Sequence, residues 1–176
     1  MKQFARFFLI LFVSFAMISI ASCKEDDDDD DNNNNNNPAN SVEAKIADDS
    51  NIANPTDWKS ASVSAVVVNN ITTITAVGTD GSQLIITLPV DATGTYALNA
   101  SNTSSPTIIF AEDPVAAGTN PNLLFYGVDG SGSVAITKYD KTNKKISGTF
   151  QFQVIRLLSG VRRYFTLGEI TDVTYP

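Results

Sequence analysis

Few side chains of this 176-residue chain can do chemistry, because it has no histidine and a single cysteine, Cys23. Histidine-based triads, Cys–His pairs and ordinary zinc sites need residues that this composition lacks. Carboxylates are the remaining candidates for acid–base catalysis of the kind that glycosidases perform. The acidic residues considered are Glu112, Asp113, Asp129, Asp140, Glu169 and Asp172.

Most of these carboxylates have a simpler interpretation. Asp80, Asp129 and Asp140 lie among Gly, Ser and Asn residues, where aspartate is favoured because it hydrogen-bonds to the backbone of a turn. Glu169 and Asp172, in the segment LGEITDV, fall near the end of the last expected strand, where they could flank a pocket or simply face solvent. The sequence therefore predicts no enzyme, no catalytic residue, no metal site and no cofactor.

The cysteine has a different chemistry available to it. Lys2 and Arg6 precede an apolar segment, Phe7 to Ile20, which has the length of a signal-peptide core and is short for the roughly 20 residues that span a bilayer. Ile20-Ala21-Ser22-Cys23 resembles the lipobox of bacterial lipoproteins. The resemblance implies that residues 1–22 are a cleaved signal peptide and that Cys23 carries lipid on its sulfur and its amino group. A retained anchor helix is the alternative.

The residues after Cys23 predict a cellular location and a disordered tether. Lys24, Glu25 and Asp26 resemble the short export tag of Bacteroidetes surface lipoproteins, which implies the outer face of the outer membrane; the periplasmic leaflet is the alternative. Asp26 to Asn37 is a run of Asp and then Asn, a composition that buries no apolar area. We expect residues 23–40 to be a disordered, lipid-anchored tether and residues 41–176 to form one domain.

That domain has nine basic and twelve acidic side chains and no Arg-rich stripe, which excludes a nucleic-acid partner. Period-two alternation recurs between turn residues, most clearly in Ile146 to Val154, where Ile, Gly, Phe, Phe and Val share one face and Ser, Thr, Gln and Gln the other. No helical window outlasts a turn. We expect an all-β, antiparallel fold of about nine strands, closed as a sandwich or as a rolled barrel.

The strand boundaries follow the same alternation. Asn69-Asn70 and Thr79 to Ser82 predict two tight reversals, so that Ala61 to Leu88 forms a three-stranded meander, and Asp140 to Lys144 predicts a hairpin connection. The expected strands are Val42–Ala47, Ala61–Val68, Ile71–Gly78, Gln83–Leu88, Gly94–Leu98, Pro106–Ala111, Leu123–Val128, Gly132–Tyr139, Ile146–Val154 and Arg162–Val173.

Several of these segments resemble a family of uncharacterised Bacteroidetes outer-membrane lipoproteins, a domain of unknown function. The resemblance lies in Ile136 to Gln153, which contains SGTF, and in the closing segment Arg163 to Pro176. The early strand VEAKIADD, the later Trp58 and the central Gly94-Thr95-Tyr96 add to it. The resemblance implies a fold and a cellular location, but it implies no enzymatic activity.

Three kinds of binding remain open. Trp58, Tyr96, Tyr126, Tyr139 and Tyr164 could stack on the sugar rings of a glycan, helped by the Thr- and Gln-rich outer face of Phe150's strand, or they could fill the core. A barrel with an apolar interior could instead carry a small hydrophobic ligand. Leu157 and Leu158, at an expected loop tip beside Arg162 and Arg163, could contact an envelope protein in an adhesion or envelope-organising role, or mark an ordinary solvated hairpin end.

Overall fold

The computed structural model describes residues 39–99 and 101–176. The predicted signal peptide, Cys23, the Lys24–Asp26 tag and the tether as far as residue 38 lie outside the described residues. Asn40 belongs to the folded part, because its side-chain oxygen accepts a hydrogen bond of 3.2 Å from the amide of Thr174. Ten strands follow: β1 (Ser41–Ala47), β2 (Thr56–Val68), β3 (Ile71–Gly78), β4 (Gln83–Leu88), β5 (Gly94–Ala97), β6 (Thr107–Ala111), β7 (Phe125–Gly127), β8 (Ser133–Asp140), β9 (Lys145–Ile155) and β10 (Arg162–Thr174).

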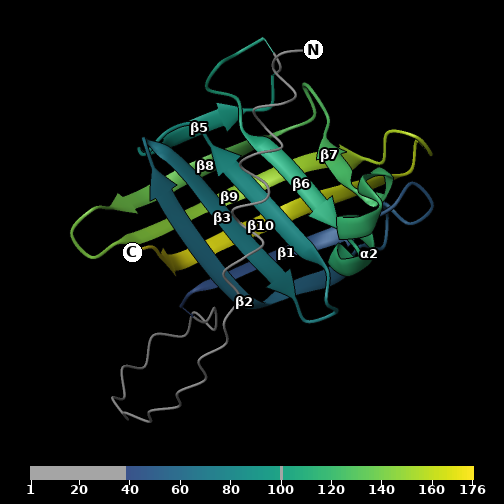
Figure 1. The fold of residues 1–176 in the computed structure, drawn as a ribbon, viewed down its shortest axis with the longest axis horizontal. Coiled ribbons are helices and arrows are strands. Elements are labelled where there is room, and N and C mark those ends of the chain that lie inside the picture. Colours follow the sequence, from purple (N-terminus) through teal and green to yellow (C-terminus); the bar gives the residue numbers. More distant parts are fainter. Residues whose placement is uncertain (1–38, 100) are drawn as a thin grey trace. The chain divides into compact units, whose positions relative to one another are not determined.

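Eight of these strands close into an antiparallel barrel in the order β10-β1-β2-β3-β4-β6-β7-β9, and β9 pairs back onto β10 (Figure 1). β8 and β5 extend the sheet from β9 outside this ring. The all-β, antiparallel prediction is confirmed, and of the two predicted closures the structure has the barrel. The three-stranded meander β2-β3-β4 is confirmed as well.

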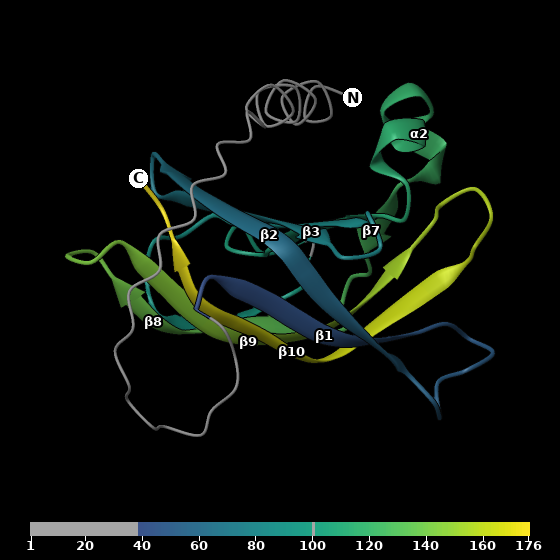
Figure 2. The same ribbon diagram turned by 90° about the horizontal axis from the view of Figure 1, so that it is seen from below.

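The barrel is flattened into two crossing layers, with β3, β4 and β6 over β8, β9 and β10 (Figures 1 and 2). β2 passes from one layer to the other: its first residues pair with β1, and from Ser60 onward it pairs with β3. A register shift between Ser60 and Ser62 marks this corner, as is usual where a strand changes sheets. The prediction that this strand starts at Ala61 was therefore wrong, because the shift breaks the alternation there.

The interior is packed with apolar side chains from both layers. Every inward residue predicted for β9, from Ile146 to Val154, is buried. Phe165 lies among Trp58, Phe110, Phe150 and Phe152, at ring-centroid distances of 5.1–6.5 Å. Burying one such side chain contributes about 1.5–3 kcal/mol, so this aromatic cluster is a main source of stability.

β7 closes the barrel with only three residues. It pairs with β6 on one side and with the last residues of β9 on the other. The rings of Phe125 and Phe110 are 5.8 Å apart, and the guanidinium groups of Arg156 and Arg163 lie 4.4 and 5.5 Å from the centroid of the Phe125 ring. Both arginines also pair with Glu112, at 3.0 and 2.6 Å, which fastens the β9–β10 loop to the end of β6.

Two short helical segments separate β6 from β7, where no helical window was predicted. The helix α2 (Pro114–Thr119) begins after Asp113, whose carboxylate accepts a hydrogen bond of 2.9 Å from the amide of Ala116. A single 3-10 turn (Pro121–Leu123) follows it. Asp113 followed by Pro114 is a helix-start signal, but six residues are too few to show an apolar period.

Candidate functional site: the outer face of β8, β9 and β10

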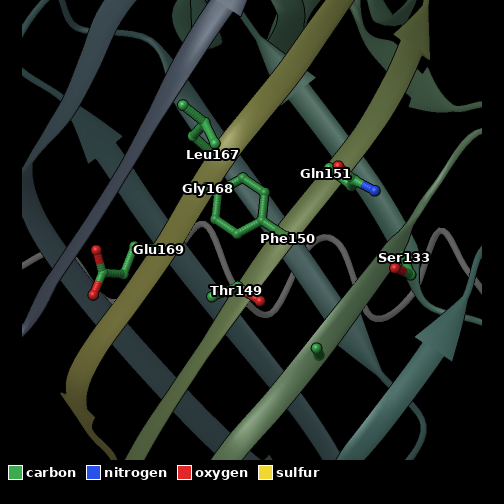
Figure 3. A pocket seen from close by; sticks show the side chains of 8 residues that line it. Ser133, Thr149, Phe150, Gln151, Leu167, Gly168 and Glu169 are labelled. Carbon is green, nitrogen blue, oxygen red and sulfur yellow. The ribbon is translucent and has the colours of Figure 1, made fainter.

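A shallow depression of about 450 Å³ lies on the outer face of three neighbouring strands. Figure 3 shows its side chains: Ser133 from β8, Thr149 and Gln151 from β9, and Leu167 and Glu169 from β10. Small residues form much of the lining, and polar atoms from each strand face the opening. Thr149 and Gln151 belong to the Thr- and Gln-rich outer face that the sequence predicted for Phe150's strand.

A β-bulge in β10 puts Leu167 on this face. β10 is flanked by β1 on one side and by β9 on the other. Between Phe165 and Gly168 it contains one residue more than the facing segment of each of these neighbours. Phe165 and Gly168 both face inward, so Thr166 and Leu167 face outward in succession. Leu167 takes a left-handed backbone with φ of 50° and is 80% exposed. That conformation costs a non-glycine residue roughly 1–2 kcal/mol, and bulges are common beside functional sites.

Gly168 is required beneath the bulge. A Cβ atom at Gly168 would lie 2.4 Å from ring atoms of Phe150, far inside van der Waals contact. The Phe150 ring is stacked on Phe152 at 5.2 Å and is buried, so a Cβ atom at Gly168 would push against the aromatic core. The floor of the depression is thereby fixed to the aromatic core.

A second, smaller depression of about 110 Å³ lies on the other side of Leu167. Glu43, Lys45, Asp57 and Lys59 line it from β1 and β2, and Leu167 and Glu169 line both depressions. Lys45 pairs with Asp57, and Lys59 lies 3.4 Å from Glu43. The hydrogen bond from Lys45 holds the pKa of Asp57 below its ordinary value, so Asp57 is ionised and its charge is matched.

Trp58 is in the core, which is the second of the two alternatives that the sequence left open for it. The side chain is 4% exposed, and its indole nitrogen donates a 2.7 Å hydrogen bond to Ser82. Ser82 in turn donates to Asp80 at 2.6 Å. The buried indole nitrogen thus has a partner within the protein, as buried polar groups require.

The structure does not gather the four tyrosines into a platform. Tyr96 donates to the carbonyl of Ala92 at 3.0 Å, and Tyr164 donates to Asp49 at 2.5 Å, a hydrogen bond that raises the pKa of Tyr164. Tyr126 sits on β7, where burial raises its pKa. The ring of Tyr139 lies 5.6 Å from that of Tyr175 at a tilt of 44°, and its hydroxyl group shares a 3.0 Å hydrogen bond with Thr72. Each tyrosine is held by contacts in a separate region of the domain.

The pair Leu157 and Leu158 lies at the tip of the β9–β10 loop, as the sequence predicted, and is 69% and 77% exposed. Figure 1 shows this loop at the same end of the barrel as α2 and the β1–β2 loop. Arg162 is exposed beside the leucines. Arg163 points to Glu112 and Phe125 instead, so it braces the barrel and is not available to an acidic partner.

The candidate carboxylates are spread over the molecule and most have structural partners. Glu112 holds two arginines, Asp113 caps α2, and Asp140 accepts from the amide of Asn143 at 2.9 Å in the hairpin turn. Asp172 pairs with Lys138 and Lys145. Glu169 lines both of the depressions described above. Within residues 39–99 and 101–176, no group of three or more His, Cys, Asp or Glu residues could hold a metal ion.

A family model for a domain of unknown function, DUF6252, matches residues 50–174. The chain belongs to the DUF6252 family. No curated protein and no solved structure matches it. In the part of the DUF6252 protein that the structure describes, none of the helices is long and apolar enough to cross a membrane.

Sequence reasoning missed three residues of the larger depression: Ser133, Leu167 and Gly168. A weak signal exists in the segment FTLGEITDV: the inward residues of β10 are Phe165, Gly168, Ile170 and Val173, so the spacing is three, two and three in place of a regular two. Strict alternation from Phe165 would turn Leu167 into the core. Only the pairing with β1 and β9 shows that it faces outward.

Proposed function

We propose that this DUF6252 protein is a surface-exposed outer-membrane lipoprotein whose β-domain binds an extracellular glycan without catalysis. The observation that carries the binding proposal is the depression over β8, β9 and β10 with the strained, exposed Leu167 on its rim. A protein keeps such strain only where the surroundings enforce it, and such residues cluster at functional sites.

The lining of the depression favours a sugar over an apolar ligand. The hydroxyl groups of Ser133 and Thr149 and the amide of Gln151 can each donate and accept hydrogen bonds, and the Glu169 carboxylate accepts them. A sugar ring offers hydroxyl groups at its rim and C–H groups on its faces. Leu167, which is 80% exposed, supplies an apolar contact surface. The apolar side chains packed inside the barrel favour the outer face over the interior as the place for such a ligand.

The dispersal of the carboxylates supports a role without catalysis. A glycosidase needs two carboxyl groups on opposite sides of one scissile bond, about 5–9.5 Å apart. Glu169 is the acidic residue of the larger depression, and Asp172 is committed to Lys138, Lys145 and Ser147. Glu43, which stands opposite Glu169 in the β1–β10 pairing, is paired with Lys59. Glu169 can therefore orient a hydroxyl group, but it has no uncommitted second carboxylate beside it.

The binding proposal is tested with the full chain, purified in detergent and screened against immobilised glycans. We expect Leu167→Ala and Gln151→Ala each to weaken binding at least tenfold. The matched controls are Leu158→Ala, which truncates another exposed leucine, and Gln153→Ala, which alters the next outward residue of β9 beyond the depression. Binding that survives both site variants, or equal losses in site and control variants, would contradict the assignment of this site.

The proposed lipid anchor and the proposed location on the cell surface are tested separately. Replacing Cys23 by Ser removes the thiol that would take up lipid, so we expect the variant to lose labelling by a radioactive fatty acid and to leave the membrane fraction. Protease added to intact cells should degrade the wild-type protein if it faces outward. Full protection from protease with normal lipid labelling would place the protein on the periplasmic leaflet instead.

A second candidate function is contact with an envelope protein through the β9–β10 loop. Leu157 and Leu158 are exposed at the end of the barrel opposite to Ser41, where β1 begins. Two adjacent leucines at a loop tip are costly to leave in water. Under this alternative, replacing both by Ser would leave the unfolding temperature unchanged and release a partner from cross-linked envelopes. An unchanged set of cross-linked partners would remove it.

A further inference from the structure

The two depressions on the outer face share a wall. Leu167 and Glu169 line both the larger depression over β8, β9 and β10 and the smaller one over β1 and β2. We infer that the depressions are two subsites of one trough, which binds an extended, uncharged oligosaccharide lying across the strands and over Leu167. This inference rests on the proposed glycan-binding function and adds the length and charge of the ligand.

The order of the strands sets the length of the trough. β8, β9, β10, β1 and β2 are neighbours in that order. Neighbouring strands lie about 4.8 Å apart, so the distance from β8 to β2 across the face is roughly 19 Å. A single sugar residue covers only part of that distance. An oligomer of several residues is needed to contact both ends of the trough.

The charges of the lining disfavour an acidic polysaccharide. Both lysines of the trough are in ion pairs, because Lys45 pairs with Asp57 and Lys59 pairs with Glu43. Glu169 takes part in none of the ion pairs found among the described residues, and it stands directly opposite Glu43 in the β1–β10 pairing. The trough therefore offers no unmatched positive charge to a uronate or sulfate group, and its one unmatched charge is negative.

The bulge places Leu167 between the two subsites. Leu167 stands outward from the strand and is 80% exposed, so apolar faces of adjoining sugar residues can pack on both sides of it. The subsites differ in size, at about 450 and 110 Å³. A short ligand should occupy the larger one, and a longer ligand should extend over Leu167 into the smaller one.

The inference is tested by titration calorimetry of the full chain in detergent. The probes are linear neutral oligosaccharides of glucose, mannose and xylose, two to six units long, and oligogalacturonates of the same lengths. We expect affinity for one neutral series to rise at least tenfold between the dimer and the pentamer. Lys59→Ala, which alters only the smaller subsite, should remove most of that gain and leave dimer binding unchanged.

Lys141→Ala is the matched control, because Lys141 is an exposed lysine paired with Asp91 outside the trough. It should bind every probe as the wild type does. Equal affinity for dimer and hexamer would overturn the two-subsite trough and leave the proposed glycan binding in place. Tighter binding of oligogalacturonates would overturn the preference for an uncharged ligand. A failure of every probe to bind would overturn both this inference and the proposed function.

Discussion

β10 contains two bulges that place a non-glycine residue in the left-handed conformation, Leu167 with φ of 50° and Asp172 with φ of 44°. Asp172 has compensating contacts: Lys138 and Ser147 donate to its carboxylate at 2.9 and 3.0 Å, and its own amide donates to Ser147. Leu167 has no polar group and is mostly in solvent. The same backbone distortion is thus stabilised locally at one bulge and left uncompensated at the other, where the trough lies.

This difference indicates two roles. Aspartate is one of the residues that tolerate the left-handed region, whereas a leucine there is uncommon. The second bulge joins β8, β9 and β10 through Asp172 and its partners, so a structural role accounts for it fully. The first bulge exposes an apolar side chain at a cost in stability, which is the pattern expected of a residue kept for binding.

The largest expected effect comes from the residue beside Leu167. Gly168→Ala puts a Cβ atom against the buried Phe150 ring, and overpacking of this kind costs about 1–3 kcal/mol. Urea unfolding followed by tryptophan fluorescence measures the change. Gly118→Ala is the control, since a Cβ atom there meets no neighbour within 4 Å. Equal effects at both glycines would show that the first bulge does not depend on close approach to the core.

The change to alanine at each bulge separates the two roles. Asp172→Ala removes charged hydrogen bonds from Lys138 and Ser147, and we expect it to lower the free energy of unfolding by about 1–2 kcal/mol. Leu167→Ala truncates an exposed side chain and should stay within about 0.5 kcal/mol of wild type. Chemical denaturation of both variants measures this. A loss at Leu167 as large as that at Asp172 would break the comparison.

A glycine at the first bulge should improve stability. Leu167→Gly relieves a left-handed strain of roughly 1–2 kcal/mol and gives back about 0.4–1 kcal/mol through the larger entropy of the unfolded chain. We expect the free energy of unfolding to rise by between zero and about 1.6 kcal/mol, while glycan binding falls with the loss of the side chain. Thermal unfolding checks the sign, and a destabilised variant would mean that Leu167 contributes to the fold.

The smallest expected effect is a pH dependence at the second bulge. Hydrogen bonds from Lys138 and Ser147 hold the pKa of Asp172 below its ordinary value. Because the folded pKa lies below the unfolded value of about 4, this contribution to stability is present above about pH 4 and is lost as the pH falls through the folded pKa. Asp172→Asn should flatten that part of the stability curve. A curve that keeps its wild-type slope below pH 4 would assign the loss to other carboxylates.

Much of the fold could be predicted because local patterns carry it. The two Asn residues at 69 and 70 both adopt positive φ, as a two-residue hairpin turn requires. The inward face of β9 follows directly from its alternation. The predictions were wrong at the start of β2 and at α2. In the first case a register shift interrupts the period, and in the second a helix of six residues has too few positions to show one.

The candidate site was predictable only in part. The Thr- and Gln-rich face of β9 was visible in the sequence, and it does line the larger depression. Trp58 and the four tyrosines have the composition of a sugar-binding platform, but each is tied to a separate region by its own contacts. Residue type indicates what a side chain can bind, whereas its position is set by neighbours that lie far away in the sequence.

The sequence by itself determined the all-β class, the hairpin turns and the two faces of β9, because each depends on residues within a few positions of one another. Only the tertiary structure decided that β7 closes a barrel, that Trp58 donates to Ser82 in the core, and that Leu167 faces outward between two depressions. These features depend on which strands become neighbours and in which register. A shift of one residue in that register moves a side chain from the core to the solvent.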